Sequence, residues 1–372
     1  MITVWRRKKI QMDHDKNQKI FLLSESKEVI EPKTLKKAKT NKRIDDDGKK
    51  YRLLSFNELP DYMKDNEYIL DYYRANWPLK EALFSLFRWH NETLNVWTHL
   101  LGFLLFMGLT IANVIHVPHV ADFIAMISEQ FPSSAEANAS KKLSAVSDDS
   151  LFILQEIESS LLEASGASPE TRWPFYVFLC GSMMCLLCSS VCHLFSCHSR
   201  RLSLQLLRLD YVGIAVMIIT SFFPPIYYIF QCSPRWQLIY LTGISAMGLC
   251  TIAALLSPSL STPRYRPLRA LLFVSMGLFG LFPALHALVI NWGDPHRDLI
   301  LAYESAMAAS YLLGTLFYVA RIPERWRPGL FDLAGHSHQI FHVFVVMGAL
   351  AHYAAAQVFL TYRGRTGCGA FA

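Results

Sequence analysis

The sequence predicts an all-α membrane protein, a seven-transmembrane helix bundle with a cytosolic N-terminus and an exoplasmic C-terminus. Of its 372 residues 52% are hydrophobic, and the mean hydropathy is +0.23, which is more apolar surface than a soluble domain of this length buries. Seven apolar runs are each about 18 residues or longer, enough to cross a hydrocarbon core of roughly 30 Å. They are continuous rather than alternating, which argues against a closed barrel. The predicted spans are 94–117, 173–195, 209–230, 236–257, 268–291, 298–320 and 338–360.

The residues before the first span differ from the rest in composition. Residues 1–58 are polar and Lys-rich and lack the apolar core of a signal peptide, so we expect a basic, flexible cytosolic tail. In residues 59–93, aromatic and aliphatic side chains alternate with charged ones, a pattern typical of short helices near a membrane surface. We expect this stretch to form a cytosolic, membrane-proximal helical segment that caps a bundle of residues 94–360.

Arginines in the short loops predict the orientation, because cytosolic loops carry an excess of positive charge. With a cytosolic N-terminus, the inner arginine groups begin at Arg200, Arg264 and Arg321. The outer short loops would hold far fewer. Residues 118–172, which are rich in acids, would form a long exoplasmic loop, and residues 361–372 an exoplasmic tail. The pattern is compatible with either the plasma membrane or an endomembrane.

Three histidines and an aspartate are predicted to lie at one depth in the membrane. His338 and His342 are four residues apart at the start of the seventh span, so they share one side of that helix. His336 points elsewhere. His193 ends the second span, and Asp210 opens the third from the same side. At a rise of about 1.5 Å per residue, His193, Asp210, His338 and His342 lie within roughly 10 Å of the cytosolic boundary.

This composition is typical of a zinc centre with an open coordination position. We predict that His193, His338 and His342 bind one zinc ion and leave its fourth position to water. Asp210 is then placed to accept a hydrogen bond from that water and to act as a general base. Ser189, one turn deeper than His193, could orient a ligand or polarise a carbonyl. Ionisable groups within a membrane are costly, which favours a functional site.

Other assignments stay open. His99 lies near the same depth and is the first substitute for His193, and a thiolate site from Cys188 and Cys192 is a further alternative. His286 and His352 lie deeper in the membrane and are expected to pack or to hydrogen-bond. The eight cysteines do not suggest a disulfide scaffold, and those of the second span are expected to be free thiols.

Five segments carry a resemblance to a known family. They are NETLNVWTHLLGF (91–103), SSVCHLFSCHS (189–199), LDYVGIA (209–215), ARIPER (320–325) and HSHQIFHVFVVMGALAHY (336–353). Together they resemble the signature segments of the progestin and adipoQ receptor family, and the full histidine set is nearer to its adiponectin-receptor branch. The long loop, SFFPPIYYIFQCSPRW and ARIPERWRPG are similar to the plant heptahelical proteins of that family.

The resemblance implies a seven-helix protein with a cytosolic N-terminus, a zinc ion near the inner leaflet and a large lipid-accessible cavity. Carried over, the zinc ligands fall on His193, His338 and His342, the partner of the bound water on Asp210, and the serine of the SxxxH motif on Ser189. The wider superfamily includes alkaline ceramidases. The first exoplasmic loop is far longer here than in the animal receptors, so adiponectin is not implied as a ligand.

Two classes of function stay open at this point. The first is a signalling receptor or sensor with an intramembrane zinc site, and the second is a zinc-dependent lipid amidohydrolase of the ceramidase type. Expected partners are a membrane lipid, such as ceramide, another sphingolipid or a steroid-like ligand, and an unidentified cytosolic signalling protein. A homo-oligomer is compatible with the sequence, and nucleic acid is not an expected partner.

Overall fold

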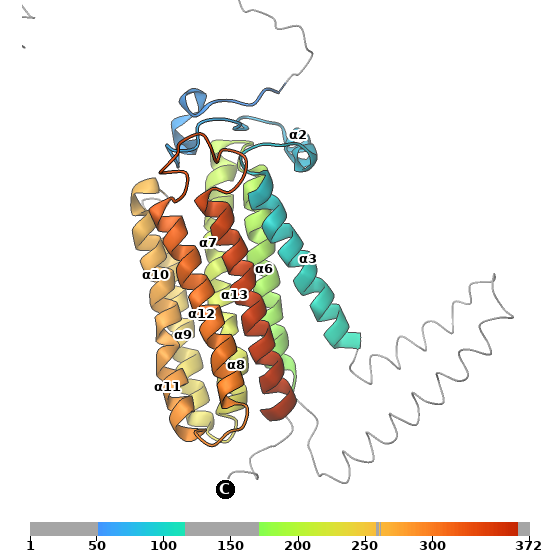
Figure 1. Cartoon of the computed structure of the whole chain (residues 1–372), viewed down its shortest axis with the longest axis vertical. Helices are drawn as coiled ribbons and strands as arrows, with labels where there is room; N and C mark the ends of the chain where they lie inside the picture. Colours follow the sequence, from blue (N-terminus) through green and yellow to red (C-terminus); the bar gives the residue numbers. More distant parts are fainter. Residues whose placement is uncertain (1–50, 116–170, 258–259, 261, 364–372) are drawn as a thin grey trace, which may run out of the picture. The chain divides into compact units, whose positions relative to one another are not determined.

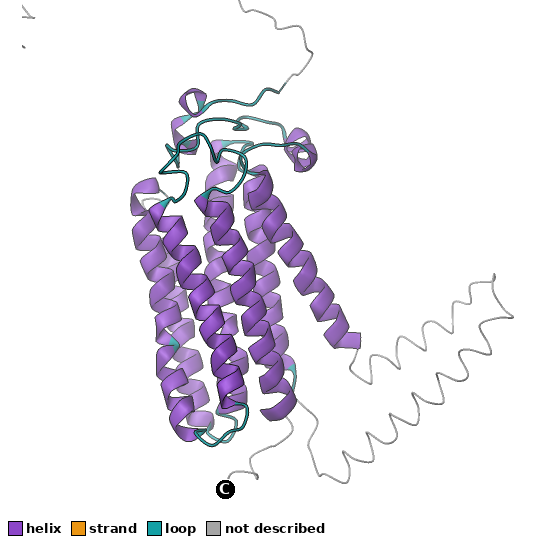
Figure 2. Cartoon of the chain, in the orientation of Figure 1, coloured by secondary structure: helices purple, strands orange, loops and turns teal. Residues whose placement is uncertain are grey.

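The structure, a computed structural model, describes residues 51–115, 171–257, 260 and 262–363. Within these residues seven helical segments are long and apolar enough to cross a membrane, as predicted, and no strand is formed (Figures 1 and 2). The chain is therefore a multi-pass integral membrane protein with an all-α fold. The expectations for the tail before residue 51, nearly all of the long loop and most of the C-terminal tail lie outside the described residues.

The spans are α3 (Thr93–Ile115), α6 (Trp173–Phe195), α7 (Arg200–Ser221) with α8 (Phe223–Ile229), α9 (Pro234–Leu255), α10 (Arg266–Phe279) with α11 (Leu281–Ile290), α12 (Arg297–Ala320) and α13 (Ser337–Val358).

Two of the spans are broken by proline. The sequence of the third span predicts a break at Pro224 and Pro225, and α7 does end at Ser221, four residues before Pro225. The fifth span breaks in the same way, because α10 ends at Phe279 and Pro283 follows four residues later. A proline ring clashes with the carbonyl four residues earlier and cannot donate a hydrogen bond to it. Each helix therefore ends at that carbonyl and restarts.

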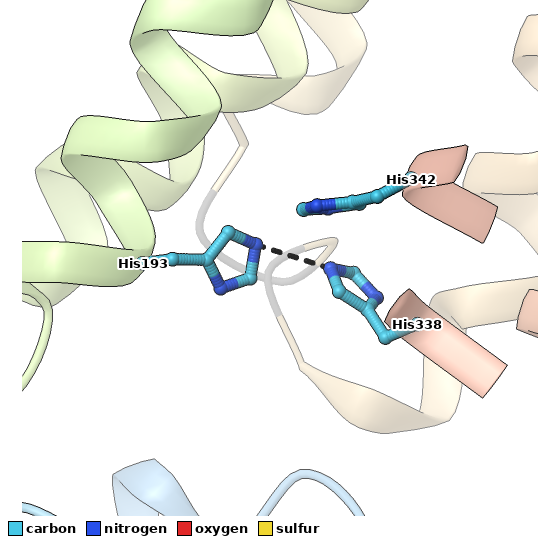
Figure 3. Close-up of side chains that lie close together, drawn as sticks. All are labelled: His193, His338 and His342. Carbon is cyan, nitrogen blue, oxygen red and sulfur yellow. Dashed lines mark hydrogen bonds between the residues drawn. The ribbon is translucent and has the colours of Figure 1, made fainter. Parts of the chain in front are cut away.

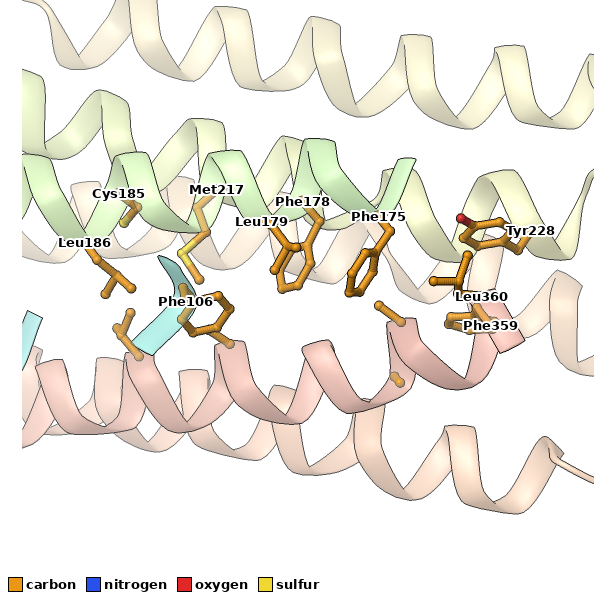
Figure 4. Close-up of a cluster of buried hydrophobic side chains, with 14 residues drawn as sticks. Phe106, Phe175, Phe178, Leu179, Cys185, Leu186, Met217, Tyr228, Phe359 and Leu360 are labelled. Carbon is orange, nitrogen blue, oxygen red and sulfur yellow. The ribbon is translucent and has the colours of Figure 1, made fainter. Parts of the chain in front are cut away.

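The spans bury a central apolar cluster and expose apolar side chains outward. The cluster joins aromatic residues of α3, α6 and the end of the seventh span, among them Phe106, Phe178 and Phe359 (Figure 4). On the outer faces large side chains such as Leu238 and Val289 are 69% and 75% exposed. Such exposure is costly in water but not in lipid, so these faces are suited to contact with acyl chains.

One end of the bundle is covered by residues 51–92, the cap segment (Figure 1). It is helical only in short stretches, namely η1 (Phe56–Glu58), η2 (Asp61–Met63), α2 (Leu79–Phe84) and η3 (Ser85–Phe87). Asp332, between α12 and α13, accepts backbone hydrogen bonds from Leu70 and Asp71, both at 2.9 Å. These bonds fix the cap segment to the connection that leads into α13.

The contact between α6 and α7 depends on a glycine, and it supports a first prediction. A Cβ added at Gly181 would lie 2.8 Å from the Cβ of Thr220, whose hydroxyl is fixed by hydrogen bonds to Val216 and Met217. Gly181→Ala should therefore destabilise the bundle by about 1–3 kcal/mol through overpacking. Gly108→Ala is the matched control, because nothing lies within 4 Å of its added Cβ, and it should be neutral or stabilising by up to about 1 kcal/mol. Thermal unfolding in detergent measures both, and equal melting temperatures would contradict the prediction.

Candidate metal centre

Three histidines from two helices converge at the capped end of the bundle. His193 ends α6, and His338 and His342 lie in the first two turns of α13. One ring nitrogen of each lies within 4.8 Å of the other two, and the Nε2 atoms of His193 and His338 are 3.1 Å apart (Figure 3). The three residues predicted as ligands are thus brought together. We call them the histidine triad.

In two members of the histidine triad the outer nitrogen donates a hydrogen bond, so the inner nitrogen keeps a lone pair that faces the other rings. The Nδ1 of His342 is 3.1 Å from the carbonyl oxygen of Asn95. A carbonyl can only accept, so Nδ1 carries the proton and Nε2 keeps its lone pair. The Nδ1 of His193 is 2.8 Å from a carboxylate oxygen of Glu92, and it donates there in the same way. Both rings are therefore fixed in the tautomer that a metal ligand needs.

The donor set fits one metal ion. Two nitrogens bound at about 2.0–2.1 Å to a tetrahedral zinc ion are roughly 3.3 Å apart, close to the 3.1 Å between His193 and His338. The Nε2 atoms of His193 and His338 are close enough to share one proton, and a metal ion bound by the triad would replace that proton, because metal ligands must be deprotonated. His193, His338 and His342 could therefore hold a metal ion.

The cap segment and the connection before α13 cap the two helix ends that carry the histidine triad. The guanidinium of Arg74, only 2% exposed, donates to the carbonyls of His193 and Leu194 at the C-terminal end of α6. The carboxylate of Glu324, fully buried, accepts from the backbone N–H of Ser337 at 2.7 Å, at the start of α13. Positive charge at a helix C-terminus and negative charge at a helix N-terminus both interact favourably with the helix dipole. The end of α6 is thereby fixed next to His193, and the start of α13 next to His338.

Ser189 and Asp210 lie in the wall of the same cavity as the histidine triad. This cavity of about 810 Å³ extends from the triad into the membrane-spanning part of the bundle. Asp210 on α7 interacts with the hydroxyl of Ser189 on α6 and with His193. Both side chains are buried, at 7% and 2% exposure. The cavity is thus continuous with the three nitrogens and with both residues predicted to assist them, whose roles remain predictions.

The other candidates occupy different positions. His99 stacks on His342 with ring centroids 3.6 Å apart. Among the described residues, the group whose donor atoms are close enough to share one metal ion contains neither His99 nor the cysteines. His336 is buried and turns toward the carbonyl of Asn91, and burial lowers its pKa, which keeps it neutral. His286 is hydrogen-bonded to Tyr240, as expected of a residue deep in the bundle. Cys188 and Cys192 are free thiols.

Sequence reasoning missed three residues of this site, Glu92, Arg74 and Glu324. Glu92 had a usable signal, since it is an acid immediately before the first span and therefore at the same depth as Asp210. Arg74 had none, because its partners lie far away in the sequence, and Glu324 lies in the ARIPER segment, which gives no sign that its carboxylate accepts from Ser337 and Asn66. Arg74 contacts residues 119 and 120 positions away, and Glu324 contacts Asn66 across 258 positions.

Fold and site together define a seven-helix membrane protein with a buried histidine triad of metal-binding composition. Comparison with known proteins agrees with this class. The model of the family described as haemolysin-III related matches residues 87–353. The chain is 58% identical over 331 residues to the heptahelical transmembrane protein ADIPOR1 of Oryza sativa subsp. japonica, across 87% of this chain and 88% of that protein. It is 56% identical over 320 residues to heptahelical transmembrane protein 1 of Arabidopsis thaliana, across 86% and 85%.

A more distant relative belongs to the animal branch. The adiponectin receptor protein of Drosophila melanogaster is 33% identical over 315 residues, across 84% of this chain and 61% of that protein. The chain therefore belongs to the haemolysin-III-related family, which comprises the progestin and adipoQ receptors, and the resemblance in its motifs is confirmed. The plant heptahelical transmembrane proteins are among its relatives, as the loop and proline motifs indicated.

Proposed function

We propose that the chain is an adiponectin-receptor-like receptor or sensor with one intramembrane zinc ion, and that it binds a membrane lipid. The observation that carries this proposal is the cavity of about 810 Å³ that begins at the histidine triad. Its wall is mainly apolar in the bundle and polar at the triad, a combination suited to an amphipathic ligand with its polar group toward the metal. The relatives named as heptahelical and adiponectin receptor proteins support the class.

Zinc is the metal that the donor set favours. Three neutral imidazole nitrogens with no sulfur are typical of catalytic-type zinc sites, in which one position stays open. Hard cations such as Mg²⁺ and Ca²⁺ prefer oxygen ligands. His193, His338 and His342 would hold the ion, and Glu92 would orient His193.

We also propose that the capped end of the bundle faces the cytosol. The loops at this end hold the arginine groups that begin at Arg200, Arg264 and Arg321, as the positive-inside rule requires. Cys232, which lies at the opposite end between α8 and α9, is disulfide-bonded. Disulfides persist in oxidising compartments, which supports an exoplasmic location for that end. The N-terminus would then be cytosolic, where a signalling partner could contact the cap segment.

A zinc-dependent lipid amidohydrolase is the second candidate, and the positions of Asp210 and Ser189 in the cavity wall favour it. A zinc ion in the histidine triad would supply a water acidified to a pKa near 7 and would polarise an acyl carbonyl. A carboxylate oxygen of Asp210 would take the proton of the attacking water and deliver it to the leaving amine. The Ser189 hydroxyl would orient the carbonyl. The amide of a ceramide-like lipid and one water would yield a fatty acid and a sphingoid base.

One experiment separates the two candidates. The purified protein is expected to contain about one zinc ion per chain, by elemental analysis, and ceramide is expected to raise its melting temperature. The hydrolase predicts fatty-acid release that Asp210→Ala reduces by a hundredfold or more, since general-base catalysis contributes about 10²–10⁴. Lipid binding without release by the zinc-loaded protein would exclude the hydrolase and leave the receptor. A protein with neither zinc nor lipid binding would refute both.

A further inference from the structure

A second polar site lies deeper in the same cavity. Glu304 on α12 and His352 on α13 both line it, and a carboxylate oxygen of Glu304 is 3.0 Å from the Nδ1 of His352. Neither residue belongs to the histidine triad. Ionisable groups at this depth are costly and usually have a function.

The hydrogen-bonding capacity of this pair is not used within the described residues. The Glu304 oxygen and His352 Nδ1 are close but not aligned for a hydrogen bond, and both ring nitrogens of His352 are buried without a hydrogen-bond partner. The His352 side chain is 2% exposed, whereas that of Glu304 is 26% exposed. The ring of Phe178 has its centroid 4.7 Å from the imidazole and offers no conventional acceptor. A buried polar group without a partner costs stability, so a ligand that supplies one would be favoured.

The spacing between the two polar sites can be read from α13. His352 lies ten residues beyond His342, which is about 15 Å along the helix axis. An extended chain advances about 1.2 Å per bond, so about twelve bonds cover this distance. Apolar side chains such as Val345 from α13, Met217 from α7 and Ala308 from α12 line the cavity, together with the ring of Tyr311, which packs against Gly348 between the two sites. An acyl chain could therefore follow the wall from one site to the other.

We propose that Glu304 and His352 bind a hydroxyl group on the acyl chain of the cavity's lipid, about twelve bonds from the polar group at the histidine triad. This inference rests on the proposed lipid-binding function and names its ligand class, a mid-chain hydroxylated acyl lipid. The hydroxyl donates its one proton to a carboxylate oxygen of Glu304 and accepts from the N–H of the His352 ring. A plain methylene chain leaves these groups unpaired, which a site built for a hydroxyl penalises strongly.

Binding of matched fatty acids tests this proposal. The zinc-loaded protein is titrated by calorimetry with octadecanoic acid, 12-hydroxyoctadecanoic acid and 2-hydroxyoctadecanoic acid. The 12-hydroxy acid is expected to bind at least about tenfold more tightly than the other two. The 2-hydroxy acid has the same composition with its hydroxyl at the wrong end, so it controls for polarity.

Variants assign the preference to the pair. Glu304→Leu and His352→Phe should remove the preference for the 12-hydroxy acid, while affinity for octadecanoic acid is kept or raised. Glu304→Gln, which keeps the side-chain shape, should weaken the preference, and it serves if Glu304→Leu does not fold. Ser305→Ala, at the next position in the same wall, should leave the preference unchanged.

The outcomes separate this inference from the proposed function. If octadecanoic acid binds and the three acids have equal affinity, Glu304 and His352 are only a contact between helices, and the inference is wrong while the lipid cavity stands. The inference is also wrong if the preference survives in both Glu304→Leu and His352→Phe. If no acid binds to the zinc-loaded protein, the proposed function fails and this inference fails with it.

Discussion

His338→Ala is expected to reduce the zinc content from about one ion per chain to less than about a tenth under mild chelation. His338 and His193 present their Nε2 atoms to each other at 3.1 Å, so removing one imidazole takes away a third of the protein ligands. Two histidines bind zinc far more weakly than three, because each lost imidazole must be replaced by a water. Elemental analysis after dialysis against a weak chelator measures the change.

His336→Ala is the control, because it removes an imidazole two residues away that faces Asn91 rather than the histidine triad. It should retain stoichiometric zinc. Both variants must show the helical content of the parent protein for the comparison to hold. Full zinc content in a folded His338→Ala protein would exclude this histidine as a ligand, and equal losses in both variants would point to general unfolding.

The number and placement of the spans could be predicted from sequence, whereas their ends could not. The third span starts with α7 at Arg200, nine residues before its predicted start at residue 209. A hydropathy pattern stops at charged residues, but backbone hydrogen bonding continues until a cap, and here the Ser199 hydroxyl accepts from Leu202. The break between α10 and α11 was also missed, although Pro283 is its physical cause. Apolar length therefore predicts where lipid contacts a helix, and local capping determines where the helix ends.

The histidine triad could also be predicted, because it depends on spacing within one helix and on depth in the membrane. The spacing of His338 and His342 is local, and His193 and Asp210 follow from membrane depth once the orientation is assumed. The residues that fix these ligands could not be predicted, since Glu92 and His193 are 101 positions apart and come together only through the packing of α3 against α6. A pattern within one helix carries no information about which side chain of another helix it will meet.

Glu324→Ala is expected to have the largest effect on stability, lowering the free energy of unfolding by about 3 kcal/mol or more. The Glu324 carboxylate is fully buried and accepts from three donors, namely Asn66 Nδ2 at 3.0 Å, the Ser337 N–H at 2.7 Å and the Ser337 hydroxyl. Each donor left buried and unpaired costs about 1–3 kcal/mol. The same change frees the start of α13, one residue before His338, so zinc affinity should fall together with the melting temperature.

The neighbouring Arg325 provides the control, because its side chain is exposed and Arg325→Ala should change stability by no more than about 0.5 kcal/mol. Glu324→Gln retains an acceptor oxygen but loses the charge at the helix N-terminus, so its melting temperature should lie between those of the parent and Glu324→Ala. Thermal unfolding and chelator competition on the three variants give both quantities. A Glu324→Ala protein of lower stability but unchanged zinc affinity would contradict the second part of this prediction. The histidine triad would then keep its geometry although the start of α13 is no longer fixed. Glu324 would in that case join the cap segment to the bundle but would not position His338.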